Sequence, residues 1–155
     1  MTKSIVCDFA KISTMAEYRA AMEHHLSGLG DISLVVLNAG VIRPGMSHSL
    51  ADEAIEEVVR VNALHVCFAS KIFLEILTKR THRSAMIIVS SVTALASIPG
   101  MASYSSAKAF ASSFGEALHY EVKDKVDVMV WTPSNVQTDI YANIVSGDKL
   151  ENAKM

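Results

Sequence analysis

Four short runs of the chain are apolar almost throughout, and they do not alternate with polar residues. Such runs are typical of strands that are buried on both faces, as in a parallel sheet. The four runs predict strands at residues 4–9, 34–40, 85–91 and 126–133.

Longer stretches between these runs have the apolar periodicity of amphipathic helices. The first covers residues 13–28, where Thr14 stands three residues before Glu17, the spacing of a capping box. The second covers residues 49–80, with acidic residues early and basic residues late, as the helix dipole favours. The third covers residues 103–124.

Strands and helices therefore alternate along the whole chain. This order predicts an α/β fold with a parallel sheet and right-handed crossovers. No repeat, low-complexity segment or linker interrupts the sequence, so residues 1–155 are interpreted as a single domain.

Composition and charge narrow the class of protein. Half of the residues are hydrophobic, which disfavours disorder. The 14 Lys and Arg residues stand against 16 Asp and Glu residues and form no basic run, so nucleic acid is not an expected partner. The apolar runs are too short to span a bilayer, and no signal-peptide pattern opens the sequence. The two Cys and six His residues lack metal-ligand spacing, so no metal site is expected.

Polar or small residues follow each predicted strand. Ligands of parallel α/β sheets bind outside the carboxyl ends of the strands, so these residues predict a cleft at that edge. They are Asp8, then Asn38 with Ala39 and Gly40, then Ser90 with Ser91, and finally Thr132 with Pro133.

The segment after the third strand carries the candidate chemistry. Tyr104 and Lys108 are four residues apart, so a helix places them on one face. A phenol has a reference pKa of about 10, and a neighbouring ammonium group lowers such a value. Ser91, at the strand end, has a hydroxyl that can bind the substrate oxygen served by the phenol. These residues predict reversible proton transfer to or from a carbonyl or alcohol oxygen.

The same residues resemble the motifs of the short-chain dehydrogenases/reductases. Ser91, Tyr104 and Lys108 match the catalytic Ser and Tyr-x-x-x-Lys, and Asn62 matches the fourth catalytic position. The letters "LNAG" are similar to the family's Asn-Asn-Ala-Gly motif. The letters "PSNVQT" are similar to its Pro-Gly-x-Val-x-Thr segment, with serine in place of the glycine. The resemblance covers about residues 3–141.

This resemblance implies an NAD(P)(H)-dependent oxidoreductase that interconverts a ketone and a secondary alcohol by hydride transfer. Tyr104 would be the general acid in reduction and the base in oxidation. Lys108 would favour the phenolate and hold the nicotinamide ribose, Ser91 would polarise the substrate carbonyl, and Asn62 would keep a water near Lys108. Besides Tyr104 and Lys108, the implied cofactor-binding residues are Asp8, Asn38, Ala39, Gly40, Pro133, Val136 and Thr138.

Within the family, the segments "DFA", residues 90–121 and "VMVWTPSNVQT" look most like very-long-chain 3-oxoacyl-CoA reductases and 17-beta-hydroxysteroid dehydrogenases. That branch implies a 3-oxoacyl or steroid-like substrate and NADP(H) in preference to NAD(H). It also implies association with the endoplasmic reticulum membrane, whereas a cytoplasmic location is expected outside the branch. The family's usual dimer implies a homodimer through the helices that carry Asn62 and Tyr104.

The sequence departs from the family pattern at its start. Members begin with a strand, the turn Thr-Gly-x-x-x-Gly-x-Gly, a helix and a second strand, and this turn holds the cofactor pyrophosphate. None of the seven glycines belongs to such a turn. We therefore expect a Rossmann-like, three-layer parallel sheet with helices on both faces that lacks the first two strands and the Gly-rich turn.

That gap removes the expected neighbours of the strand at residues 4–9. The strand would move beside the strand at 34–40, fray, or receive a partner molecule. The chain would be a part of a longer enzyme, or a short protein that keeps catalytic residues without firm cofactor binding. A non-catalytic binding or scaffold protein on the same fold is an alternative. Ser105 and Lys108 also match the Ser-x-x-Lys of β-lactamases, but the companion motifs Ser-Asp-Asn and Lys-Thr-Gly are absent.

Overall fold

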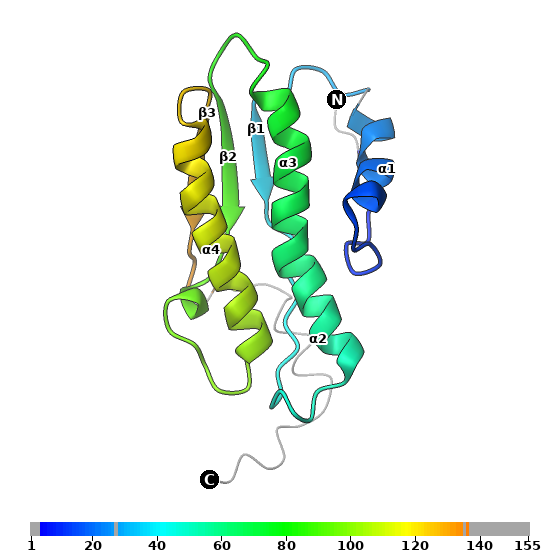
Figure 1. Ribbon diagram of the computed structural model, residues 1–155, viewed down its shortest axis with the longest axis vertical. Coiled ribbons are helices and arrows are strands. Elements are labelled where there is room, and N and C mark those ends of the chain that lie inside the picture. The colour runs from blue at the N-terminus through cyan, green and yellow to red at the C-terminus, as the bar shows by residue number, and fades with distance from the viewer. Residues whose placement is uncertain (1–3, 27, 135, 137–155) are drawn as a thin grey trace.

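Three parallel strands form the sheet of this protein (Figure 1). The structure is a computed structural model that describes residues 4–26, 28–134 and 136. Within that part of the chain, the strand order is β1–β2–β3, which confirms the predicted α/β fold and its parallel pairing. The strands are β1 (Leu34–Leu37), β2 (Ser84–Val89) and β3 (Val126–Trp131).

The carboxyl ends of the strands meet at one edge of the sheet, because all three run in the same direction (Figure 1). Leu34 lies opposite Ala85 where β1 pairs with β2, and Ser84 lies opposite Val126 where β2 pairs with β3. Only the central strand β2 is buried or half-buried at every position. Every second residue of the outer strands β1 and β3 is exposed. The prediction that these two strands are buried on both faces was therefore wrong.

The strand predicted at residues 4–9 is not formed. Residues 4–8 have no regular secondary structure, and Phe9 and Ala10 form a turn. A strand is stable only when a neighbour completes its backbone hydrogen bonds, and the sheet has no strand beside this segment among the described residues. The segment has therefore not moved beside β1 and is frayed in this single chain. Pairing with a partner molecule stays a prediction.

The described part of the chain has four α-helices, one π-helical turn and one 3-10 turn. Helix α1 precedes β1, and the other helical elements connect the strands. The predicted helix over residues 49–80 contains α2, η1 and α3, which follow one another directly. Among the residues that the structure describes, no helix combines the length and apolar character needed to cross a membrane. The elements are α1 (Met15–Leu26), α2 (Asp52–Val59), η1 (Arg60–Leu64), α3 (His65–Leu77), η2 (Val92–Ala94) and α4 (Ala102–Val122).

The capping box predicted before α1 is confirmed. The Glu17 carboxylate accepts the backbone N–H of Ser13 at 2.9 Å and that of Thr14 at 2.8 Å, and the Thr14 hydroxyl accepts the N–H of Glu17 at 3.3 Å. The bonds that the carboxylate accepts lower the pKa of Glu17, with the Ser13 bond the largest cause. They satisfy N–H groups that the first turn of a helix leaves without helical partners.

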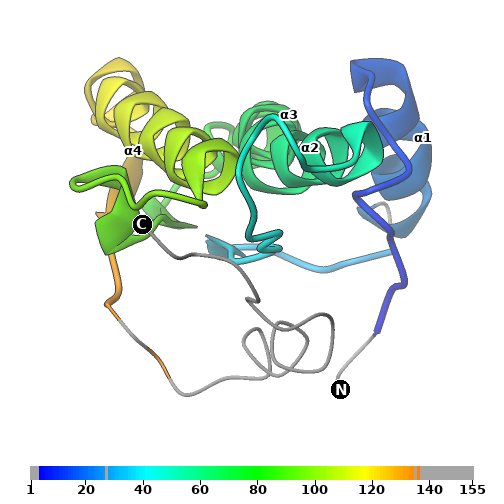
Figure 2. The same cartoon turned by 90° about the horizontal axis from the view of Figure 1, so that it is seen from below.

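The described helices lie on one face of the sheet (Figure 2). The expected three layers are therefore two layers in this part of the chain. Without a strand at residues 4–9, α1 does not cross over the sheet; it packs beside α3, where Arg19 donates to the two oxygens of Glu75 at 2.7 and 3.1 Å. On the opposite face, four apolar residues are half-exposed: Leu34, Val36, Met129 and Trp131.

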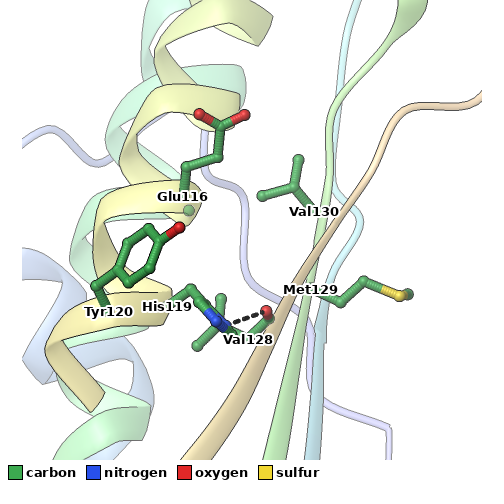
Figure 3. A pocket seen from close by; sticks show the side chains of 7 residues that line it. Glu116, His119, Tyr120, Val128, Met129 and Val130 are labelled. Carbon is green, nitrogen blue, oxygen red and sulfur yellow. Dashed lines mark hydrogen bonds between the residues drawn. The ribbon is translucent and has the colours of Figure 1, made fainter. Parts of the chain in front are cut away.

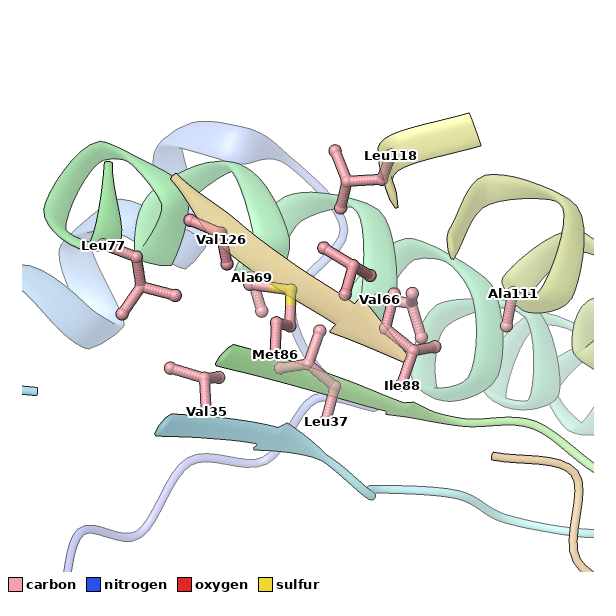
Figure 4. Close-up of a cluster of buried hydrophobic side chains, with 11 residues drawn as sticks. Val35, Leu37, Val66, Ala69, Leu77, Met86, Ile88, Ala111, Leu118 and Val126 are labelled. Carbon is pink, nitrogen blue, oxygen red and sulfur yellow. The ribbon is translucent and has the colours of Figure 1, made fainter. Parts of the chain in front are cut away.

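The main hydrophobic core fills the space between the sheet and the helices (Figure 4). Met86 and Ile88 of the central strand are completely buried there. Burial of apolar surface is the dominant favourable contribution to folding, so this layer holds the fold together. Its buried members are Val35, Leu37, Val66, Ala69, Leu77, Met86, Ile88, Ala111, Leu118, Val126 and Val128.

Helix α4 approaches the sheet closely at Gly115. A Cβ atom there would lie 2.5 Å from Val130 Cγ2 and 3.1 Å from Ile88 Cδ1. Glycine inside a helix costs about 1 kcal/mol relative to alanine, so its presence here is explained by the close contact rather than by helix stability.

Gly115→Ala is expected to lower the free energy of unfolding by about 1–3 kcal/mol, because the added methyl group overpacks the core. Denaturant unfolding measures this change. Ser113→Ala, at an exposed position of the same helix, is the matched control and should leave stability nearly unchanged. If Gly115→Ala were as stable as the wild type, α4 would be free to move away from the sheet.

Candidate functional site

The candidate site lies at the carboxyl edge of the sheet, where the loop after β1, the turn η1 and the start of α4 meet (Figure 1). The N–H of Gly45 donates to the carbonyl oxygen of Gly100 at 2.8 Å, which joins the loop after β1 to the turn before α4. A second cluster of buried apolar residues packs between these elements: Ile42, Val58, Ala63, Tyr104 and Ala107.

Asn62 is completely buried in the π-helical turn η1. Its amide nitrogen donates to the carbonyl oxygens of Val58 and Val41, both at 2.9 Å, and its Oδ1 accepts the N–H of Val41 at 3.3 Å. Asn62 therefore ties the helix to the loop after β1. Single π turns occur frequently at functional sites, and the apolar periodicity of the sequence did not predict this one.

Lys108 is a buried cation, with 3% of its surface exposed. Its ammonium group donates to the carbonyl oxygen of Val89, the last residue of β2, at 2.9 Å. Burial lowers the pKa of Lys108 from 10.5 to about 8. The ammonium nitrogen lies 5.8 Å from the centre of the Tyr104 ring, so the two residues share a face of α4 as their spacing predicts.

Gly40 lies between Asn62 and Lys108. A Cβ atom on Gly40 would stand 3.1 Å from Asn62 Oδ1 and 3.4 Å from Lys108 Nζ. The structure thus brings three predicted site residues to one point, and the missing side chain of Gly40 leaves room for both functional groups.

Ser91 precedes the 3-10 turn η2 and caps it. Its hydroxyl oxygen accepts the N–H of Thr93 at 3.2 Å and the hydroxyl of Thr93 at 3.0 Å. A serine hydroxyl has two acceptor positions and one proton, so these bonds leave the proton for donation to a ligand. Thr93 orients Ser91, and it was not identified from the sequence. It could have been found from its hydroxyl group two residues after Ser91, the spacing of local Ser/Thr turns.

The end of β2 is fastened to both β3 and α4. The N–H of Ser90 donates to the carbonyl oxygen of Trp131 at 2.8 Å, and the N–H of Val92 donates to that of Pro133 at 3.1 Å. The Ser90 hydroxyl donates to the carbonyl oxygen of Lys108 at 2.8 Å. The predicted residue Pro133 therefore has a structural contact at the carboxyl edge of the sheet.

The other predicted cofactor-binding residues differ in their placement. Asn38 and Ala39 lie in the loop that contains Gly40, so they belong to the same edge of the sheet. Val136 is exposed, and Thr138 lies outside the described residues.

Asp8 was predicted to stand at the end of a strand, but it lies in the turn before α1. Its exposed carboxylate accepts the N–H of Ala10 at 3.1 Å. The turn is attached to the helix that carries the site: Arg60 donates to the carbonyl oxygen of Ala10 at 3.2 Å, and the rings of Phe9 and His65 lie 4.0 Å apart.

His65 is a buried group that the sequence did not single out. Burial, with a smaller contribution from the positive charge of Lys108, lowers its pKa from 6.5 to about 4. The imidazole is therefore neutral at neutral pH. Its position three residues after Asn62, on the same face of a helix, was the signal that could have found it.

A shallow hollow of about 420 Å³ lies between the second half of α4 and β3 (Figure 3). Glu116, His119, Tyr120 and Val130 are among its lining residues, and His119 Nδ1 lies 3.2 Å from the carbonyl oxygen of Val128. None of the predicted site residues lines this hollow. In the described part of the chain, no three His, Cys, Asp or Glu residues gather in a group that could hold a metal ion.

The arrangement around Lys108 is suited to proton transfer at a ligand oxygen. An ammonium group close to a phenol favours the phenolate and makes the phenol a better proton donor. Ser91 offers a hydroxyl proton at the end of the same strand that binds Lys108. Gly40 borders both the ammonium group and the Asn62 side chain.

Known proteins resemble this chain along most of its length. The family profile described as "short chain dehydrogenase" matches residues 2–149. The chain is 35% identical over 115 residues to the 2,3-dihydro-2,3-dihydroxybenzoate dehydrogenase of Bacillus subtilis (strain 168), covering 72% of this chain and 43% of that protein. It is 30% identical over 128 residues to the very-long-chain 3-oxoacyl-CoA reductase of Bos taurus, covering 80% of this chain and 39% of that protein.

Solved structures show the same architecture. A gluconate 5-dehydrogenase from Burkholderia cenocepacia J2315, in complex with NADP and tartrate, superposes with a TM-score of 0.79 at 21% identity. The superposition covers 91% of this chain and 54% of that structure. The chain thus spans about half, or less, of the length of these three proteins.

Lys108→Met is expected to be more stable than the wild type at about pH 7, by about 1–2 kcal/mol, because it removes a buried charge. The pKa of Lys108 is 10.5 in the unfolded chain and about 8 in the folded chain, so between these values only the unfolded chain binds the proton. Wild-type stability should therefore rise relative to the variant as the pH increases from about 8 to about 10.

Urea unfolding of both proteins at about pH 7 and about pH 10 checks this difference. Lys123→Met, at an exposed position, is the control and should behave like the wild type at both pH values. A stability difference between Lys108→Met and the wild type that does not change with pH would contradict the prediction.

Proposed function

Because the chain belongs to the short-chain dehydrogenase family, we propose that it forms the catalytic part of an NAD(P)(H)-dependent oxidoreductase that interconverts a ketone and a secondary alcohol. The observation that carries this proposal is the buried Lys108 ammonium group, which lies beside Tyr104, Asn62 and Gly40. Burying a cation costs free energy, and perturbed, buried ionisable groups concentrate at functional sites.

A bound nicotinamide cofactor would supply or accept the hydride in the proposed reaction. Tyr104 donates its phenolic proton to the substrate oxygen in reduction and removes that proton in oxidation. Ser91 donates a hydrogen bond to the same oxygen while Thr93 holds its hydroxyl from the other side. Lys108 favours the phenolate and would hold the ribose hydroxyls of the cofactor, and Asn62 fixes the loop that passes Lys108 at Gly40.

Several residues fit a nicotinamide cofactor. The absence of a side chain at Gly40 lets its loop pass close to the Lys108 ammonium group, and Asn38 and Ala39 precede Gly40 in that loop at the carboxyl edge of the sheet. The chain has no Gly-rich turn of the family pattern to hold the cofactor phosphates. We therefore propose contacts to the nicotinamide end from these residues, with Asp8 on the adenine side.

For the substrate, we propose a 3-oxoacyl or steroid-like ketone, with NADP(H) as the cofactor. The support is the 30% identity to a very-long-chain 3-oxoacyl-CoA reductase and the likeness of residues 90–121 to that branch. A relative at 35% identity bears the name of a different substrate. Assaying a 3-oxoacyl thioester against a steroid ketone and a dihydrodiol separates these substrate classes; turnover of the dihydrodiol alone would overturn the proposal.

A non-catalytic binding protein on the same fold is the second candidate function. The observation that favours it is that none of the seven glycines belongs to the family's phosphate-binding turn. Cofactor binding by the chain distinguishes the two functions.

The 155-residue chain is expected to bind NADPH, because Lys108 and the loop at Gly40 are already positioned for the nicotinamide end. Titration followed by the fluorescence of NADPH measures the binding, with NADH titrated in parallel. An absence of binding at millimolar cofactor would contradict independent activity of this chain and favour the non-catalytic function.

Tyr104→Phe is expected to lower ketone reduction by about 10²–10⁴-fold, because it removes the proposed acid. Tyr120→Phe is the matched control, since Tyr120 lies on the same helix but is 72% exposed. Steady-state assays of the three proteins measure the effect. Retained turnover in Tyr104→Phe would remove Tyr104 from the acid role.

We also propose a homodimer through the helices that carry Asn62 and Tyr104. Phe110 of α4 is 43% exposed, and its ring stacks on that of Phe114 at 5.9 Å. Exposed aromatic residues are enriched at interfaces between proteins. Sedimentation equilibrium should show a dimer that Phe110→Lys converts to a monomer, and a dimer unchanged by Phe110→Lys would exclude this interface.

A further inference from the structure

The turn that contains Asp8 is attached to the site by an aromatic contact. We propose that the packing of Phe9 against His65 is a clamp that positions the Asp8 turn beside the helix carrying Asn62, and thereby sets cofactor affinity. The clamp itself is inferred from the structure alone. Its effect on cofactor affinity rests on the proposed function.

Phe9 connects two helices through its ring. It lies 4.0 Å from the His65 ring at an interplanar angle of 36° and stacks on Tyr18 of α1 at 5.7 Å and 11°. Tyr18 in turn meets Phe68 of α3 edge-on at 5.3 Å. Aromatic pairs at these separations stabilise a structure beyond the burial of their surface, so Phe9 holds its own segment to both α1 and α3.

The rings on the helical side of this contact are deeply buried. Tyr18 is 0% and His65 is 4% exposed. The Tyr18 hydroxyl and His65 Nδ1 have no hydrogen-bond partner among the described residues. Buried polar atoms without partners cost free energy, so the ring contacts have to offset that cost. Phe9 therefore packs against the ring surfaces of Tyr18 and His65, and their polar atoms do not take part in the contact.

His65 also keeps its charge away from the site. It is neutral at neutral pH, because burial and the nearby charge of Lys108 lower its pKa. A neutral ring packs against Phe9 without placing a second cation near Lys108. His65 is thus suited to a positioning role and not to carrying a proton at neutral pH.

The Asp8 turn is built directly around Phe9. The Asp8 carboxylate accepts the N–H of Ala10 at 3.1 Å, and the Asp8 carbonyl oxygen accepts the N–H of Lys11 at 3.1 Å. Arg60 binds the carbonyl oxygen of Ala10 at 3.2 Å. Phe9 and Ala10 therefore make adjacent attachments to the helical stretch that includes Asn62.

The segment needs this attachment because it is not part of the sheet. Residues 4–8 have no strand neighbour among the described residues, and a segment without such pairing opens easily unless side chains hold it. The contact between Phe9 and His65 therefore fixes the position of this segment in place of strand pairing.

Phe9→Leu and His65→Leu test the clamp, with Phe9→Tyr and His65→Phe as variants that keep an aromatic ring. The first measurement is amide hydrogen exchange at Ala10 and Lys11 in the whole chain. The second is the Kd and KM for NADPH. The leucine variants should raise the exchange rates by about three- to tenfold. They should raise the Kd and the KM by a similar factor and leave kcat nearly unchanged. The aromatic variants should restore wild-type values, and the double leucine variant should be no worse than either single variant.

Each outcome separates the clamp from the proposed function. Unchanged exchange at Ala10 and Lys11 in the leucine variants would overturn the clamp, whether or not NADPH binds. Faster exchange with an unchanged Kd would overturn the effect on cofactor affinity. If the wild type bound no NADPH while exchange rose in the variants, the clamp would stand, and the proposed function would fail together with the effect on affinity.

Discussion

The burial of one ammonium group, that of Lys108, is the constraint on which the site depends. A cation leaves water only where its surroundings bind it. Here the end of β2 provides the carbonyl oxygen of Val89, α4 provides the ring of Tyr104, and the loop after β1 passes at Gly40. These three elements have to meet at the carboxyl edge of the sheet for the charge to be buried at all. The pKa of about 8 records the cost of that burial.

Asn62 solves a related problem on the neighbouring helix. Its side chain binds a helical carbonyl oxygen at Val58 and both backbone groups of Val41. The π turn and the loop after β1 are thus one hydrogen-bonded unit, and the loop reaches Lys108 because of it. Ser91 and Thr93 form a comparable pair at the end of β2. Asn62, Ser91 and Lys108 are thus held by backbone groups before any ligand enters.

Local patterns in the sequence predicted much of this arrangement. The capping box at Thr14 and Glu17 and the spacing of Tyr104 and Lys108 depend only on near neighbours, so they could be read directly. The strand at residues 4–9 could not, because pairing depends on a neighbouring strand elsewhere in the chain. The π turn at Asn62 also escaped, since one shifted hydrogen bond barely changes the apolar periodicity. The contact of Phe9 with His65 joins distant segments, and no local pattern signals it.

The face of the sheet opposite the described helices bears on how the protein behaves at high concentration. Asp127, Met129 and Trp131 alternate along β3, so they share that face, and Asp127 forms an ion pair with Arg83. At the same end of the sheet, Arg80 pairs with Asp31 at 2.6 Å. Charges that flank an apolar strand oppose edge-to-edge association. The pair of Arg83 and Asp127 is exposed on both sides and salt screens such pairs, so association of this protein with itself should respond to ionic strength.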